Sequence, residues 1–119
     1  MNDDLTGGIY VHFPYCVHRC FYCDFNLVTP KVIPQRAYTE AILQELNQRA
    51  KRLNQPAHSL YFGGGTPSLW ETSWFAQVIA AARVSPGLQP DAEITLEVNP
   101  SDVTQERCEA WLEAGINRL

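Results

Sequence analysis

The amino-acid sequence predicts an α/β fold built on a parallel sheet. Three short runs of β-branched and aromatic residues, at 8–13, 59–62 and 93–98, alternate with three segments of helical periodicity. Proline or glycine follows each run and marks its end. Because strands that alternate with helices pair in parallel through right-handed crossovers, two architectures fit: an open doubly wound sheet, or part of a (β/α) barrel.

The first predicted strand, residues 8–13, is stopped by Pro14. Residues 14–34 contain three cysteines and three prolines, which predicts a long irregular loop, and a loop of this length is typical of a functional segment. A helix is expected over 35–53, since apolar side chains recur there every three to four residues, at Tyr38, Ile42, Leu46, Ala50 and Leu53.

The second predicted strand, residues 59–62, leads into the Gly-Gly-Gly-Thr-Pro turn at 63–67. Ser68 and Glu71 have the spacing of a capping box, which predicts the start of the next helix. The buried stripe of that helix is expected at Trp74, Phe75, Val78, Ile79 and Ala82.

The third predicted strand, residues 93–98, is followed by a helix that Thr104 can cap and Gly115 can end. We expect one face of this helix to be buried, with Cys108 as a small core residue beside Trp111 and Leu112. Ile116 onward has the composition of a fourth strand. We therefore expect residues 1–119 to be the N-terminal part of a larger domain, with three βα units.

Composition excludes several classes of protein. The chain has 119 residues, 45% of them hydrophobic, and a net charge of −4 with a pI near 5.2, which is typical of a small globular domain. Negative charge disfavours nucleic acid and anionic lipid as partners. No run approaches the roughly 18 apolar residues of a transmembrane helix, and the acidic N-terminus is unlike a signal peptide. These features predict a reducing, cytoplasmic location.

Three of the four cysteines, Cys16, Cys20 and Cys23, lie within eight residues, which indicates a metal or redox centre rather than a disulfide framework. Zinc remains possible if His18 or His12 supplies a fourth ligand. An iron–sulfur cubane held by three cysteines would leave one iron open to a small molecule. Spacing alone does not decide between these two centres.

Two further features lie at the ends of predicted strands. The glycine turn at 63–67 has neither the spacing of a P-loop nor that of a dinucleotide-binding motif, but it allows backbone to approach a ligand closely. Glu97 places a carboxylate near the end of the third strand. Since ligands of parallel α/β folds bind at the carboxyl ends of strands, we expect the cysteines, the turn and Glu97 to share one pocket.

Together these residues resemble the radical S-adenosylmethionine superfamily. The similarity is strongest to its branch of oxygen-independent coproporphyrinogen III oxidases and HemW-type haem chaperones. The matching segments are residues 9–16, 20–26, 63–68 and 97–100. The resemblance implies a partial, TIM-like (β/α) barrel with parallel strands.

The resemblance also implies the site residues. Cys16, Cys20 and Cys23 would ligate three irons of a [4Fe–4S] cluster, and the fourth iron would chelate the amino and carboxylate groups of S-adenosylmethionine. In catalytic members the reduced cluster cleaves this cofactor to a radical that abstracts hydrogen from the substrate. The expected contacts to the cofactor are made by Tyr10, Tyr22, Gly64, Gly65, Thr66 and Glu97.

One position separates the two groups of the branch. The oxidases resemble a pattern with a further cysteine two residues after the third, and this chain has Phe25 there. The resemblance therefore favours a HemW-type protein that binds haem as cargo and passes it to an acceptor protein. A porphyrinogen-binding, S-adenosylmethionine-dependent coproporphyrinogen III oxidase (dehydrogenase) is the alternative, so whether the chain is an enzyme stays open.

Overall fold

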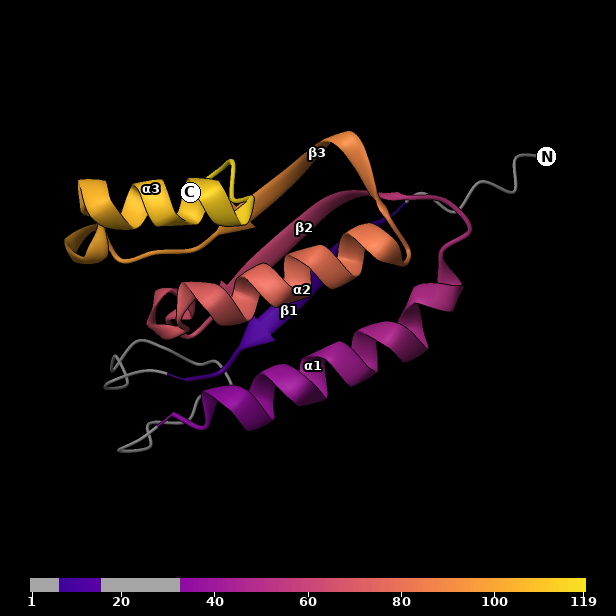
Figure 1. Ribbon diagram of the computed structural model, residues 1–119, viewed down its shortest axis with the longest axis horizontal. Helices are drawn as coiled ribbons and strands as arrows, with labels where there is room; N and C mark the ends of the chain where they lie inside the picture. Colours follow the sequence, from indigo (N-terminus) through magenta and orange to yellow (C-terminus); the bar gives the residue numbers. More distant parts are fainter. Residues whose placement is uncertain (1–6, 16–32) are drawn as a thin grey trace.

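Three parallel strands form a sheet in the order β1–β2–β3 in the computed structural model, and three helices lie side by side over one face of it (Figure 1). The structure describes residues 7–15 and 33–119. The elements in chain order are β1 (Gly8–Phe13), α1 (Gln35–Arg49), β2 (Ala57–Gly64), α2 (Thr72–Val84), β3 (Leu88–Leu96) and α3 (Gln105–Ala114). The predicted α/β class is confirmed. Helices on a single face match a barrel segment, whereas a doubly wound sheet carries helices on both faces.

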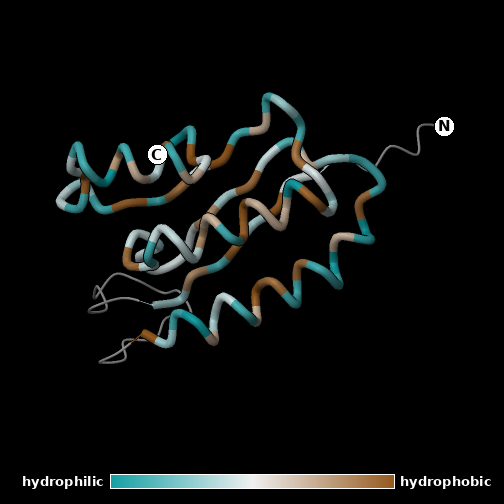
Figure 2. Tube along the Cα trace, viewed as in Figure 1, coloured by the Kyte–Doolittle hydropathy of each residue, from teal (hydrophilic) through white to brown (hydrophobic). Residues whose placement is uncertain are grey.

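The hydrophobic core lies between the helices and the sheet. Side chains alternate along a strand, so every second strand residue points into this layer. In Figure 2, α1 alternates between hydrophobic and hydrophilic residues along its length, as a helix with one covered face should. The buried apolar residues of the core are Val11, Phe13, Leu60, Phe62, Trp70, Phe75, Val78, Ile79, Ala82, Ile94, Leu96, Trp111 and Ile116.

Two strands are longer than predicted. β2 continues through the first two glycines of the expected turn, because Gly63 and Gly64 pair with His12 and Phe13 of β1. β3 begins at Leu88 and ends before the predicted position. Its early start escapes sequence analysis because a register shift opposite residues 57–59 accommodates the strand's proline.

Two details of the helices are corrected. The capping box is wrong, since Glu71 is the N-cap of α2 and no side chain caps it, while Ser68 Oγ donates to Asp102 Oδ2 at 2.9 Å. Leu112 is wrong as a buried residue because 69% of it is exposed. The expected periodicity of α1 is confirmed as far as Arg49, after which residues 50–52 tighten into a 3₁₀ turn.

The ends of α3 form as predicted. Thr104 Oγ1 accepts a hydrogen bond from the Arg107 N–H at 3.1 Å, and Gly115 has the left-handed φ of 117° that favours glycine. Beyond the helix, Arg118 pairs in parallel with Thr95 on the outer edge of β3, which is where the fourth strand was expected. Cys108 is partly buried and packs against the core, as predicted.

Candidate functional site

The face of the sheet opposite the helices carries polar side chains. Strand pairing places Tyr10, Tyr61 and Thr95 in one row across the three strands. The next row toward the carboxyl ends pairs His12 with Gly63. Because side chains alternate along each strand, these residues point away from the apolar core. The sheet therefore presents polar groups on its helix-free face, close to the ends of its strands.

Glu97 follows β3 directly, and two donors from β2 hold its carboxylate. Tyr61 Oη donates to Glu97 Oε2 at 2.7 Å, and the Gly64 N–H donates to Oε1 at 3.0 Å. The Glu97 backbone N–H donates to Phe62 O at 3.0 Å, which carries the strand pairing one residue further. The hydrogen bond to Glu97 is the main reason that the pKa of Tyr61 is raised above 10.0.

Tyr10 lies over this pair. Its ring stacks on Tyr61 with centroids 5.8 Å apart, and its hydroxyl lies 3.3 Å from His12 Nδ1. The Tyr10 residue is 57% exposed. Burial of part of the ring and the charge of Glu97 together raise the pKa of Tyr10. Tyr10 therefore has an exposed aromatic surface beside the Tyr61–Glu97 pair.

The glycines at the end of β2 are required by close packing. A Cβ on Gly63 would lie 2.8 Å from Tyr61 Cε1 and 3.0 Å from both Glu97 Oε1 and Tyr10 Cε1. Gly64 has a φ of 113°, and a Cβ there would lie 2.7 Å from the Phe13 carbonyl oxygen. The absence of side chains is therefore what lets Tyr10, Tyr61 and Glu97 converge.

Beyond Gly64, the turn is bonded to the end of β1. The Gly65 N–H donates to Phe13 O at 2.7 Å, and the Thr66 N–H donates to Tyr15 O at 3.0 Å. Tyr15 immediately precedes Cys16 in the chain. The turn and the end of β1, up to Tyr15, are therefore brought to the same end of the sheet.

A small pocket of about 170 Å³ opens between the ends of β2 and β3. One wall consists of residues 65–67 and the other of residues 97–99. Residues Gly64, Gly65 and Thr66 donate their backbone N–H groups within the chain, to Glu97, Phe13 and Tyr15. Glu97 adds a carboxylate to the second wall. This pocket therefore offers hydrogen-bond acceptors and negative charge, which suit a cationic group of a ligand.

A larger groove of about 680 Å³ runs between β1 and α1 and is lined mainly by apolar side chains. It follows β1 from Gly8 to Pro14, so Tyr10 and His12 border it as well as the converging polar groups. Tyr38 borders this groove, and among the described residues its buried hydroxyl is without a hydrogen-bond partner. Burial is the main cause of the raised pKa of Tyr38.

The structure places five of the predicted cofactor contacts together: Tyr10, Gly64, Gly65, Thr66 and Glu97. Cys16, Cys20, Cys23 and Tyr22, like His18 and Phe25, lie outside the described residues. Within residues 7–15 and 33–119, no three potential ligands among His, Cys, Asp and Glu gather into a metal site. The same part of the chain contains no helix that is long and apolar enough to cross a membrane.

Sequence analysis missed Tyr61, which binds the Glu97 carboxylate and supports the Tyr10 ring. Strand alternation was the available signal, since Tyr61 lies two residues before Gly63 and so shares its face.

Comparison with known proteins gives a consistent result. The profile of the radical SAM superfamily matches residues 10–119. Radical S-adenosyl methionine domain-containing protein 1, mitochondrial, from Bos taurus is 40% identical over 115 residues, which are 95% of this chain and 26% of the relative. Heme chaperone HemW from Haemophilus influenzae is 37% identical over an alignment of 118 residues that covers 94% of this chain and 31% of the relative. The chain thus spans about a quarter to a third of the length of these relatives.

Among solved structures, the coproporphyrinogen III oxidase HemN from Escherichia coli, described as a radical SAM enzyme, is similar with a TM-score of 0.81. The two chains are 27% identical, and the match covers 98% of this chain and 27% of the other. The order of strands and helices described above is therefore also that of a solved protein.

Proposed function

The chain belongs to the radical SAM superfamily, and on this premise we propose that it binds a [4Fe–4S] cluster and S-adenosylmethionine at the carboxyl ends of β1, β2 and β3. We further propose that it is a haem chaperone of the HemW type. Haem would be its cargo, and a haem-acceptor protein its partner.

One observation carries the proposed cofactor site. The hydrogen bonds from Gly65 and Thr66 to Phe13 and Tyr15 join the glycine turn to the backbone that leads into Cys16. A ligand held by the turn would therefore lie near a cluster on the cysteines. The proposed cluster ligands are Cys16, Cys20 and Cys23.

The residues around the turn fit S-adenosylmethionine by their chemistry. The cofactor carries a positive sulfonium and an amino group whose N–H can donate, and the pocket offers acceptors together with the Glu97 carboxylate. Since that amino group donates, backbone contacts of the turn to it would use carbonyl oxygens, while the N–H groups of Gly64 and Gly65 are donated within the chain. Tyr10 and Tyr22 would line the cofactor. When bound, the cluster and cofactor supply one-electron chemistry.

Two features support haem as the cargo. The relatives that are 37% and 34% identical, from Haemophilus influenzae and Synechocystis, are both named Heme chaperone HemW. Phe25 stands where the resembling oxidases have a further cysteine.

We propose a cytoplasmic location, although the mammalian relative is named as mitochondrial.

The similarity to HemN favours a second candidate, an oxygen-independent coproporphyrinogen III oxidase. The two candidates predict different fates for a porphyrinogen. The anaerobically reconstituted protein is incubated with coproporphyrinogen III, S-adenosylmethionine and a reductant, with Escherichia coli HemN as the positive control. We expect no turnover of the porphyrinogen, and stable haem binding in a parallel incubation with haem. Accumulation of protoporphyrinogen IX would contradict the chaperone and support the oxidase.

Metal content tests the cluster itself. Anaerobic reconstitution with iron and sulfide should load iron and inorganic sulfide in equal amounts, with about four of each per chain for a cubane. Uptake of one zinc per chain without sulfide would contradict the proposal and would indicate a zinc site on the same cysteines.

A further inference from the structure

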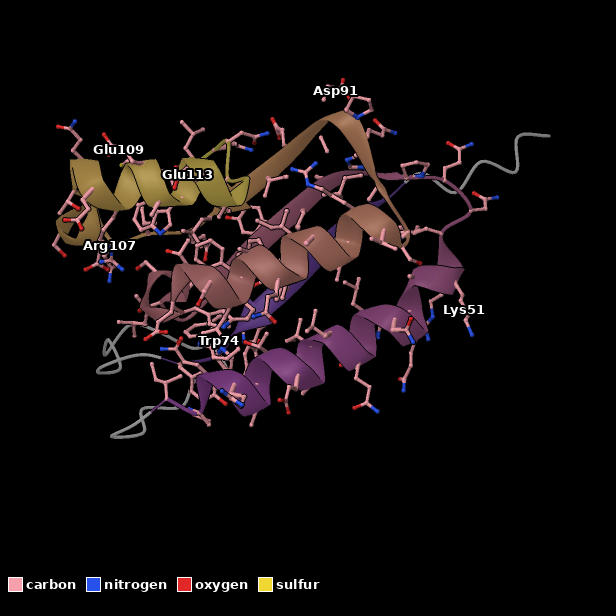
Figure 3. All side chains as sticks on the ribbon, viewed as in Figure 1. Lys51, Trp74, Asp91, Arg107, Glu109 and Glu113 are labelled. Carbon is pink, nitrogen blue, oxygen red and sulfur yellow. The ribbon has the colours of Figure 1, made fainter. Side chains whose placement is uncertain are left out.

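The two walls of the small pocket are joined behind it by one arginine. Residues 65–67 run directly into Ser68, and residues 97–99 are followed by a short turn that ends at Asp102. Arg107, in the first turn of α3, reaches both loops. In Figure 3 its side chain lies on the side of α3 nearest the start of α2.

The guanidinium of Arg107 bonds to each loop. Arg107 Nη2 donates to Ser68 O at 2.6 Å, and Nη1 donates to Asp102 O at 3.4 Å. The Asp102 carboxylate adds an ion pair at 3.9 Å and accepts from Ser68 Oγ at 2.9 Å. Ser68 is only 2% exposed, so its hydrogen bonds are shielded from water. We call Ser68, Asp102 and Arg107 the loop clamp.

Two contacts hold Arg107 itself in place. Its backbone N–H donates to the capping Thr104 Oγ1, and its guanidinium lies 5.3 Å from the ring centroid of Trp111, which is 2% exposed. A planar guanidinium held in this way can donate to two acceptors at a fixed separation. The single ammonium of a flexible lysine fixes such a separation less well.

A different residue, Gln35 of α1, binds the other side of the β2–α2 connection. Gln35 Nε2 donates to Leu69 O at 3.1 Å, and Gln35 Oε1 accepts from the Glu71 N–H at 2.7 Å. Both bonds join α1 to the β2–α2 connection, so they do not fix the distance between that connection and the β3–α3 loop. Within the described residues, the loop clamp is therefore the contact that joins Ser68 to the β3–α3 loop.

We propose that Arg107 is a positioning residue that sets the separation of the two pocket walls and thereby the affinity for S-adenosylmethionine. This inference rests on the proposed cofactor site. Arg107 does not line the pocket, so its effect passes through Ser68 and Asp102.

The first test measures the dissociation constant of S-adenosylmethionine on the reconstituted protein by equilibrium dialysis. Arg107→Leu removes both donors, and we expect the dissociation constant to rise about tenfold. The dissociation constant of Arg107→Lys should lie between those of wild type and Arg107→Leu. A change of less than about twofold in Arg107→Leu would overturn the proposal.

Two variants separate positioning from general stability. Arg36 lies 5.8 Å from the Trp74 ring centroid, so Arg36→Leu removes a similar stacked arginine that has no contact with the loop clamp in the described part of the chain. Val78→Ala weakens the fully buried core. Both should leave the dissociation constant within about twofold of wild type. If Val78→Ala weakens binding as much as Arg107→Leu, the effect follows stability and the proposal is wrong.

A second test needs no cofactor. Hydrogen–deuterium exchange of the amides of Gly65, Thr66 and residues 97–99 should be faster in Arg107→Leu and unchanged in Arg36→Leu. Unchanged exchange in Arg107→Leu would overturn the loop clamp whatever the ligand. Absence of S-adenosylmethionine binding to wild type, with faster exchange in the variant, would instead contradict the proposed function and leave the loop clamp supported.

Discussion

Replacing Gly63 with alanine places one methyl group among the three side chains that form the site. The new Cβ would lie 2.8 Å from Tyr61 Cε1, about 0.6 Å inside the 3.4 Å at which ordinary contact begins, and 3.0 Å from both Glu97 Oε1 and Tyr10 Cε1. Gly63 is buried and its backbone is extended. The cost of the substitution therefore comes from the steric clash of the new Cβ with its neighbours and not from backbone strain.

The expected size of the effect follows from these distances. Overpacking of a close-packed site costs about 1–3 kcal/mol. Alanine recovers about 0.5–1 kcal/mol through the lower entropy of the unfolded chain. Taking the middle of each range, we expect Gly63→Ala to lower the free energy of unfolding by about 1 kcal/mol. Retreat of Tyr61 and Glu97 should also weaken binding of S-adenosylmethionine.

Urea denaturation of the reconstituted protein and equilibrium dialysis of S-adenosylmethionine measure the two effects. Gly7→Ala is the matched control, because a Cβ there would meet a single atom of a flexible side chain, Leu53 Cδ2, at 3.2 Å. The control should remain close to wild type in both measurements. Wild-type stability and affinity in Gly63→Ala would refute the proposed reason for this glycine.

Three other predictions follow from single contacts. Thr39→Val should lower the free energy of unfolding by about 1–3 kcal/mol in urea denaturation, because the buried Trp70 Nε1–H loses the acceptor that lies 2.8 Å away. Thr39→Ser keeps this hydroxyl and should lower the free energy of unfolding less than Thr39→Val does. The raised pKa of Tyr61 stabilises the fold fully below the ordinary value of 10.0, and this contribution is lost as pH rises through the higher folded pKa. The urea midpoint of wild type should therefore fall more steeply between pH 10.0 and the folded pKa than that of Tyr61→Phe, and parallel curves would contradict the Tyr61–Glu97 hydrogen bond. Cys20→Ala should abolish cluster assembly, since two thiolates cannot hold the cubane; an intact cluster in iron and sulfide assays would refute the ligand assignment.

Local patterns predicted most of the fold because their physical causes are local. Hydrophobic periodicity identified each helix, and the cap of α3 by Thr104 and its end at Gly115 depend on residues within one turn. The order of strands and helices then limited the architecture to two choices. Only the placement of all three helices on one face separated them.

The errors share a non-local cause. Ser68 was expected to cap α2, but its partner Asp102 lies 34 residues away. The start of β3 depends on a register shift against β2, which no pattern within β3 reveals. Tyr61 joins the site only because pairing places it beside Tyr10 and its hydroxyl reaches Glu97. Contacts of this kind depend on how the elements pack together, so no pattern within a single element reveals them.

The most direct test of the cofactor site compares wild type with Glu97→Gln. Both proteins are reconstituted anaerobically, their iron and sulfide are measured, and S-adenosylmethionine binding is followed by equilibrium dialysis. We predict equal cluster content, with binding about five- to tenfold weaker in the variant, since loss of a charged partner at a half-buried position costs about 1 kcal/mol or more. A wild-type protein that carries the cluster and binds no S-adenosylmethionine, or a variant that binds it equally well, would contradict the account.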